Sequence, residues 1–131
     1  MKRFALLVAF LTGFAGAAFA EPVIGTWATA PDDNGNYGHV EISACGEKIC
    51  GVLVRAFNGD GEQIESDNIG RRIVWDMVAQ GEGQYRRGRV YAPDRDKTYR
   101  SKMDLAGDAL DVSGCILGGV ICRAARWTRV E

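Results

Sequence analysis

The sequence has a single histidine, His39, and contains no Gly-x-Ser-x-Gly, His-Glu-x-x-His, phosphate-loop or dinucleotide-binding motif. Alternation places His39 on the outward side of its predicted strand, opposite to Val40 and Ile42, which argues against a general base. The chain also lacks an excess of one charge, because 16 basic residues face 17 acidic ones, and this disfavours a nucleic-acid-binding protein. We therefore expect neither an enzyme nor a nucleic-acid partner, and no cofactor.

Long apolar runs are absent after residue 20, but one run over residues 4–19 follows two basic residues. It leads into Ala18-Phe19-Ala20, the small-x-small pattern that precedes signal peptidase cleavage. A membrane anchor is the disfavoured alternative, because the run is shorter than the ~20 residues that cross a bilayer. The sequence thus predicts a signal peptide over residues 1–20 and a periplasmic or secreted domain over residues 21–131, with no integral membrane segment after cleavage.

Cysteine is scarce, and the Cys-x-x-Cys pattern of thioredoxin-type redox pairs and zinc knuckles is absent. An even number of cysteines in an exported domain predicts disulfides, and the chain has Cys45, Cys50, Cys115 and Cys122. A turn at Gly118-Gly119 would set Cys115 opposite Cys122, and a turn at Glu47-Lys48 would set Cys45 opposite Cys50. Opposed residues on antiparallel strands are close enough to be bridged, so we expect these two local disulfides and no metal site.

Turn-forming residues divide the rest of the chain into short β-rich segments, without an amphipathic run of helical period longer than about ten residues. The expected strands cover residues 23–28, 37–44, 49–57, 72–78, 84–92, 97–105, 109–116 and 120–130. Short turns between them predict one all-β domain, a single up-and-down antiparallel β-barrel of about eight strands. Residues 58–71 are the one long irregular stretch, which favours a solvated loop or a lid over a calcium loop.

Alternation along the strands also assigns side chains to the two faces of the barrel wall. Cys115 and Cys122 both fall outside, in agreement with their expected bridge. With Cys45 opposite Cys50, Arg55 falls in the inward row, where a cation needs an internal carboxylate or a bound anion. Two alternatives stay open for residues 85–91. Their arginines either lie outside and pair with acids, or share an inward row that faces a pocket, made of Tyr85, Arg87, Arg89 and Tyr91.

Two motifs near the ends, Gly25-Thr-Trp27 and Trp127-Thr-Arg129, resemble a lipocalin-like (calycin) barrel, in which a Gly-x-Trp packs against a late arginine. Between them, residues 89–99 (RVYAPDRDKTY) and 110–114 (LDVSG) closely resemble the exported bacterial family of domain of unknown function 2147. The resemblance covers nearly the whole mature chain, which carries Arg87-Gly88 where a glycine pair is common. It implies a lipocalin-like barrel in the periplasm or outside a Gram-negative cell, and no established activity. The residues implied to close the barrel are Gly25, Trp27, Trp127 and Arg129.

Two hypotheses of function follow. The first is an exported binding protein that holds a small amphipathic or anionic molecule in the barrel mouth. The expected ligand-binding residues are three arginines and an aromatic wall: Arg55, Arg87, Arg89, Trp75, Tyr85, Tyr91 and Tyr99. The second is a structural or interaction protein of the cell envelope, with a barrel filled by its own side chains and no small-molecule ligand.

Overall fold

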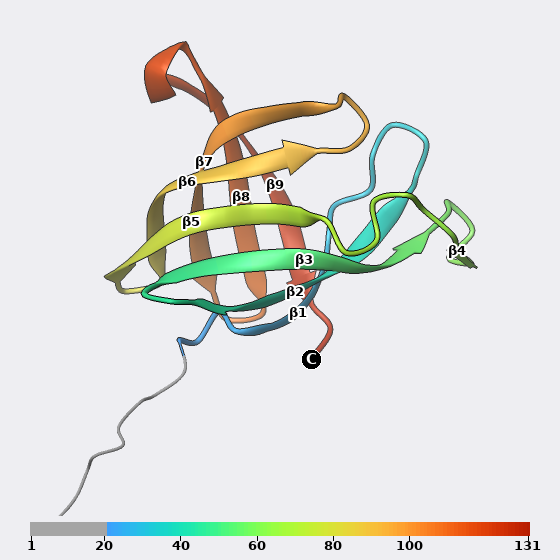
Figure 1. Cartoon of the computed structure of the whole chain (residues 1–131), viewed down its shortest axis with the longest axis horizontal. Coiled ribbons are helices and arrows are strands. Elements are labelled where there is room, and N and C mark those ends of the chain that lie inside the picture. Colours follow the sequence, from blue (N-terminus) through green and yellow to red (C-terminus); the bar gives the residue numbers. More distant parts are fainter. Residues whose placement is uncertain (1–20) are drawn as a thin grey trace, which may run out of the picture.

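The computed structural model describes residues 21–131, and the predicted signal peptide over residues 1–20 lies outside the described residues (Figure 1). Within 21–131, no helix is long and apolar enough to cross a membrane. Apart from one short 3₁₀ turn, the regular secondary structure of the described chain is all β-strand, as the turn pattern predicts. Its strands are β1 (Gly25–Ala28), β2 (Tyr37–Cys45), β3 (Lys48–Phe57), β4 (Gln63–Ile64), β5 (Arg72–Gly81), β6 (Gln84–Ala92), β7 (Lys97–Ala106), β8 (Ala109–Ile116) and β9 (Ile121–Arg129).

The strands form one antiparallel sheet in the order β2-β1-β9-β8-β7-β6-β5-β3-β4. An additional pairing between β2 and β3 closes the sheet on itself. Eight strands make the wall, and the two-residue β4 pairs with the end of β3 (Figure 1). The predicted all-β, up-and-down barrel is therefore confirmed. Closure pairs the backbone groups that an open sheet would leave at its edges.

The barrel interior is packed at one end, where alternating residues of neighbouring strands meet. Val40, Val74, Met77, Met103 and Leu110 are completely buried there. They belong to one apolar cluster that also includes both buried tryptophans, Trp27 and Trp127. Since β-strands direct every second side chain inward, this cluster fixes which face of each strand is interior.

The disulfide between Cys45 and Cys50 is present, but its register is not the predicted one. Cys45 pairs with Lys48 across a two-residue turn, and Cys50 pairs with Ser43, so the two cysteines are not directly opposed. Their Cα atoms are 5.8 Å apart, still within the range that a disulfide spans. The turn is formed at Gly46, whose φ of 65° suits glycine, instead of at Glu47-Lys48.

A β-bulge in β3 overturns the expectation that Arg55 points into the barrel. Val40 pairs with Leu53 whereas His39 pairs with Arg55, so Val54 is an extra residue on this strand. The extra residue reverses the alternation, and Arg55 joins His39 on the outer face. Its Nε donates a hydrogen bond to His39 Nδ1 over 3.3 Å. Arg55 therefore needs no buried counter-ion.

A second bulge divides the row of alternating residues predicted for β6. Tyr85 pairs with Met103, and Gly88 pairs with Ser101. Two residues of β6, Arg86 and Arg87, therefore lie opposite one residue of β7, Lys102. Arg87 has a left-handed backbone, with φ of 68°. Tyr85 consequently points inward and is only 1% exposed, but Arg89 lies on the other face. The interpretation of one inward row over residues 85–91 is wrong, because the bulge reverses the alternation between Tyr85 and Arg89.

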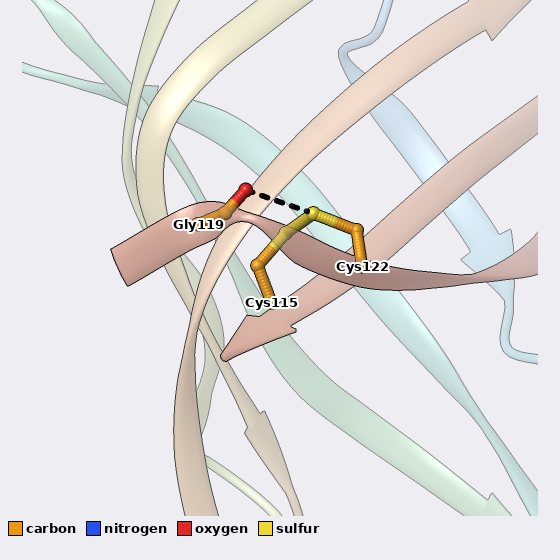
Figure 2. Close-up of a disulfide and its surroundings, with 3 residues drawn as sticks. All are labelled: Cys115, Gly119 and Cys122. Atoms are coloured by element: carbon orange, nitrogen blue, oxygen red, sulfur yellow. Dashed lines mark hydrogen bonds between the residues drawn. A yellow bond between two sulfur atoms is a disulfide. The ribbon is translucent and has the colours of Figure 1, made fainter. Parts of the chain in front are cut away.

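The β8–β9 hairpin has the predicted register at its disulfide. Cys115 pairs directly with Cys122, with Cα atoms 4.1 Å apart. The turn is longer than the predicted Gly118-Gly119 pair, because a short 3₁₀ turn, η2 (Leu117–Gly119), and Val120 connect the strands. In Figure 2 the Cys122 sulfur lies 3.6 Å from the Gly119 carbonyl oxygen, so the bridge is in contact with the turn.

Candidate functional site

One end of the barrel is closed by Trp27 and Arg129. Trp27 is completely buried, and its Nε1 donates a hydrogen bond to the Val23 carbonyl over 2.9 Å. The Arg129 guanidinium lies 4.4 Å from the centroid of the Trp27 ring, a cation–π contact. The same guanidinium donates hydrogen bonds to the carbonyl oxygens of Pro22 and Ile24, over 2.7 and 3.3 Å. Arg129 thus ties the first described residues to the last strand.

Gly25 is required by this closure. A Cβ at this position would lie 2.7 Å from both Arg129 Nη1 and the Glu131 carbonyl oxygen. Its φ of 147° is also a conformation that other residues rarely adopt. The Gly-x-Trp motif therefore has two physical reasons. Gly25 leaves room for the Arg129 guanidinium, and Trp27 provides the ring against which the guanidinium packs.

The opposite end of the barrel opens into a cavity of about 1060 Å³. Loops around the mouth contribute to its lining, including residues 29–36 between β1 and β2 and residues 93–95 between β6 and β7. Deeper in the barrel the wall is mainly apolar and comes from the strands, with Val40, Leu53, Ile73, Val112 and Trp127. The residues described here therefore leave part of the barrel interior unfilled.

Two charged residues of the described strands line the cavity, Lys97 at the start of β7 and Arg123 in β9. Arg123 lies between Ile121 and Ala125 in the inward row of β9, at the open mouth, where it is exposed to solvent. Within residues 21–131 no carboxylate oxygen lies within 4.0 Å of its guanidinium. Alternation along β9 places Arg123 on the same face as Ala125 and the buried Trp127, and this signal could have identified Arg123, which is absent from the predicted site residues.

A row of small residues runs beside Arg123 on the inner wall. Arg123 pairs with Gly114 of β8, and Gly114 pairs with Ser101 of β7. The Ser101 hydroxyl is buried and is the one such side-chain polar atom in residues 21–131 without a hydrogen-bond partner. Ser101 itself does not line the cavity, and the Tyr99 side chain lies against Gly114. Of this row, Gly114 and Arg123 therefore border the cavity.

Two predicted aromatic residues, Tyr91 and Tyr99, line the cavity. Tyr91 is held in place from two sides, because the Arg71 guanidinium lies 3.8 Å from its ring centroid and its hydroxyl donates to Asp96 Oδ1 over 2.7 Å. The hydrogen bond to Asp96 raises the pKa of Tyr91. Tyr91 is thus a neutral, oriented part of the mouth.

The other predicted ligand-binding residues do not line the cavity. Trp75 lies beneath the Arg72 guanidinium, at 4.9 Å, and Tyr85 is buried at the closed end. The Tyr85 hydroxyl donates to Glu21 over 2.9 Å, and burial together with this hydrogen bond raises its pKa to about 12. The three predicted arginines, Arg55, Arg87 and Arg89, are also absent from the lining.

Residues 58–71 lie partly at the mouth, where Ile64, Glu65, Ser66 and Asn68 line the cavity. The tip of this segment is organised by Asn58, whose Oδ1 accepts hydrogen bonds from the backbone N–H groups of Asp60 and Glu62. Within the described residues, no group of three or more His, Cys, Asp or Glu side chains is placed to hold a metal ion.

Comparison with solved structures shows a similar fold. The chain is similar to the solved structure of protein HP1028 from Helicobacter pylori, which is described as belonging to the lipocalin family. The TM-score is 0.69 and the sequence identity is 17%. The match covers 86% of this chain and 85% of that chain. The barrel is therefore lipocalin-like in fold. A search of curated proteins finds no match.

The sequence itself matches a protein family over nearly all of the barrel. Residues 25–129 match the family described as "Uncharacterized protein conserved in bacteria (DUF2147)". The matched range includes β1, which carries Gly25 and Trp27, and ends on Arg129 of β9. The chain thus belongs to the DUF2147 family of bacterial proteins.

Proposed function

We propose that the protein is an exported binding protein that holds a small amphipathic molecule with an anionic headgroup in the open end of its barrel. The carrying observation is the Arg123 guanidinium, which is exposed at the mouth of a mainly apolar cavity and has no carboxylate partner among residues 21–131. An anionic group bound there pairs with the cation, and an apolar tail extends toward Val112 and Trp127.

The headgroup position follows from Arg123, which lies beside Gly114 on the lining of the cavity. A carboxylate or phosphate suits this position, because the guanidinium offers two parallel donors. Lys97 adds a second positive charge at the mouth. This arrangement gives Arg123 the anion-binding role that the sequence suggests for Arg55.

The cavity suits a lipid-sized tail. Its volume of about 1060 Å³ is just above the ~300–1,000 Å³ typical of small-molecule pockets. The same volume disfavours the alternative of a barrel filled by its own side chains. Export is supported by the two disulfides, which persist in oxidising compartments and are rare in the cytosol.

The test is a fluorescence titration with cis-parinaric acid and with its uncharged methyl ester. We expect saturable binding of the acid, and Arg123→Gln should weaken it by about tenfold or more, since a charge-assisted hydrogen bond of ~1.5–3 kcal/mol is lost. Binding of the ester should change little. Arg126→Gln is the matched control, because Arg126 lies on the same strand and pairs outside the barrel with Asp111 at 2.9 Å.

Two further variants locate the bound molecule. Gly114→Val should weaken binding of both probes, because it adds bulk to the cavity wall beside Arg123, and the fold should tolerate it, because an added Cβ meets Tyr99 at 3.6 Å, an ordinary contact. Arg55→Gln should leave both affinities unchanged. No saturable binding of either probe to the unmutated protein, together with no retained small molecule in native mass spectra of the protein from its own cells, would refute the proposal.

A further inference from the structure

The end of the β8–β9 hairpin presents large apolar side chains to solvent. The four residues of this apolar tip and their exposed fractions are Ile116 49%, Leu117 69%, Val120 80% and Ile121 53%. Ile116 and Ile121 also border the mouth of the cavity, whereas Leu117 and Val120 do not. The space around the turn is open, since an added Cβ at Gly118 or Gly119 would meet no atom within 4 Å. Figure 1 shows the hairpin extending beyond the neighbouring strands. Clustered exposure of this kind marks a contact surface.

We propose that the apolar tip docks the protein onto a lipid bilayer that contains anionic phospholipid. The inference concerns the outside of the barrel and goes beyond ligand binding, on which it does not depend. Leu117 and Val120 enter the boundary between headgroups and acyl chains, and basic residues on the adjacent strands contact the phosphates.

The size and shape of the tip favour a bilayer over a protein partner. A specific protein interface buries about 800 Å² on each side and involves ~20–30 residues of each partner. The tip offers four side chains on a projecting turn. A bilayer imposes no such requirement, because binding to it increases with the apolar area inserted and with attraction to anionic lipid.

The charge distribution next to the tip is of one sign. Within the stretches 97–103 of β7 and 112–125 of the hairpin there is no acidic residue, and the outer face carries Arg100 and Lys102. Lys97 and Arg123 of the same stretches line the cavity instead. Arg100 pairs directly with Cys115 and also neighbours Arg89 on β6. Like charges opposite each other are unfavourable in a sheet unless an anion lies near them. The outer face beside the tip therefore complements a layer of phosphates.

The depth of insertion agrees with this arrangement. From Leu117 to the row of Cys115 and Arg100 is two residues, about 7 Å along a strand. Interfacial segments bury their apolar groups ~5–10 Å deep. Arg100 would then lie at the level of the headgroups when Leu117 is inserted. The disulfide between Cys115 and Cys122 joins the two strands at this level and holds the tip outward (Figure 2).

Vesicle flotation tests the proposal on the purified, ligand-free protein. With vesicles of equal parts phosphatidylcholine and phosphatidylglycerol, we expect the protein to float, and with phosphatidylcholine alone to float at least about tenfold less. Leu117→Ser with Val120→Ser should weaken binding by roughly tenfold or more, because two inserted apolar side chains are lost. Both positions are exposed, so the fold should be unaffected.

Matched controls separate docking from general stickiness. Val120→Ser is compared with Val130→Ser, since both valines are exposed, at 80% and 43%, but Val130 lies beyond the other end of β9. Only Val120→Ser should reduce flotation. Arg100→Gln should reduce it too, and Arg126→Gln should not. Equal flotation of Val120→Ser and the unmutated protein would overturn the proposal. A dimer in sedimentation velocity that Leu117→Ser dissolves, without any flotation, would assign the tip to a second copy of the chain and overturn it as well.

Discussion

Replacing Arg129 by alanine should destabilise the barrel far more than replacing Arg126, although both are arginines of β9. Arg129 contacts the buried Trp27 ring and donates to two backbone carbonyls near the start of the described chain. Arg126 makes an exposed ion pair with Asp111. The two variants therefore remove the same side chain from a partly desolvated contact and from a solvated one.

The contacts give the expected magnitudes. A cation over a desolvated ring contributes about 2 kcal/mol, and a hydrogen bond from a charged group to a carbonyl roughly 1.5–3 kcal/mol. Part of the second contribution is lost to solvent, because the bond to Pro22 is exposed, and the ion pair with the 87% exposed Asp108 adds under ~1 kcal/mol. We expect Arg129→Ala to lower the free energy of unfolding by about 2–4 kcal/mol, and Arg126→Ala by less than ~1 kcal/mol.

Urea unfolding of Arg129→Ala, Trp27→Ala and the double variant measures the contact itself. Trp27→Ala alone should cost about 3–5 kcal/mol, as for other buried tryptophans. Because the two side chains touch, the double variant should lose about 1–2 kcal/mol less than the sum of the single losses. Additive losses, or equal losses for Arg129→Ala and Arg126→Ala, would refute the role given to Arg129 in closing the barrel.

Four further outcomes follow from the same structure. Burial, and then the Arg55 charge, lower the pKa of His39 in the folded protein below the ordinary value of 6.5. Below pH 6.5 the unfolded chain therefore binds more protons than the folded one, and the free energy of unfolding falls as the pH drops from 6.5 to the folded pKa. Urea midpoints at neutral and mildly acidic pH should show a smaller fall for His39→Gln than for the unmutated protein. Arg87→Gly should raise the free energy of unfolding by about 1 kcal/mol, since Arg87 has a φ of 68°, and Arg89→Gly in the regular strand should lower it by a similar amount. Replacing either cysteine pair by serine should cost about 2 kcal/mol in the same assay, because each bridge closes a short loop. Finally, the intact mass of the exported protein should correspond to a chain that begins at Glu21, and a mass that retains residues 1–20 would contradict the cleavage prediction.

The fold was predictable because its signals are local and repeated. Turn residues at short intervals indicate strands joined by hairpins, and closure into a barrel follows from the need to pair every edge. The bounds of β6 are those predicted, 84–92, and the opposed pair Cys115 and Cys122 is confirmed. The strand β4 was not predicted, because two residues within a polar segment leave no periodicity to detect.

The candidate site was less predictable, because it depends on which face each strand turns inward. A single extra residue reverses every later assignment in a strand. This happens at Val54, which moves Arg55 outside, and again at Arg86 and Arg87, which separates Tyr85 from Arg89. Neither bulge can be detected from the residue types at its position. A bulge is often marked by a glycine, but here the extra residues are Val54 in one strand and Arg86 and Arg87 in the other, and arginine rarely adopts a positive φ.

The β8–β9 hairpin differs from these strands in a way that makes its inner row the firmest basis for the site. The sheet pairing of β8 and β9 is uninterrupted from Ala109 and Thr128 to Ile116 and Ile121, and a directly opposed disulfide lies within it. Because no residue is inserted, Trp127, Ala125 and Arg123 must share one face, and Trp127 is 4% exposed. Arg123 therefore lies on the same face as the buried tryptophan, but at the open mouth, where it is exposed. An anion-binding role built on Arg123 rests on a register that a disulfide holds, whereas one built on Arg55 requires an alternation that the bulge at Val54 interrupts.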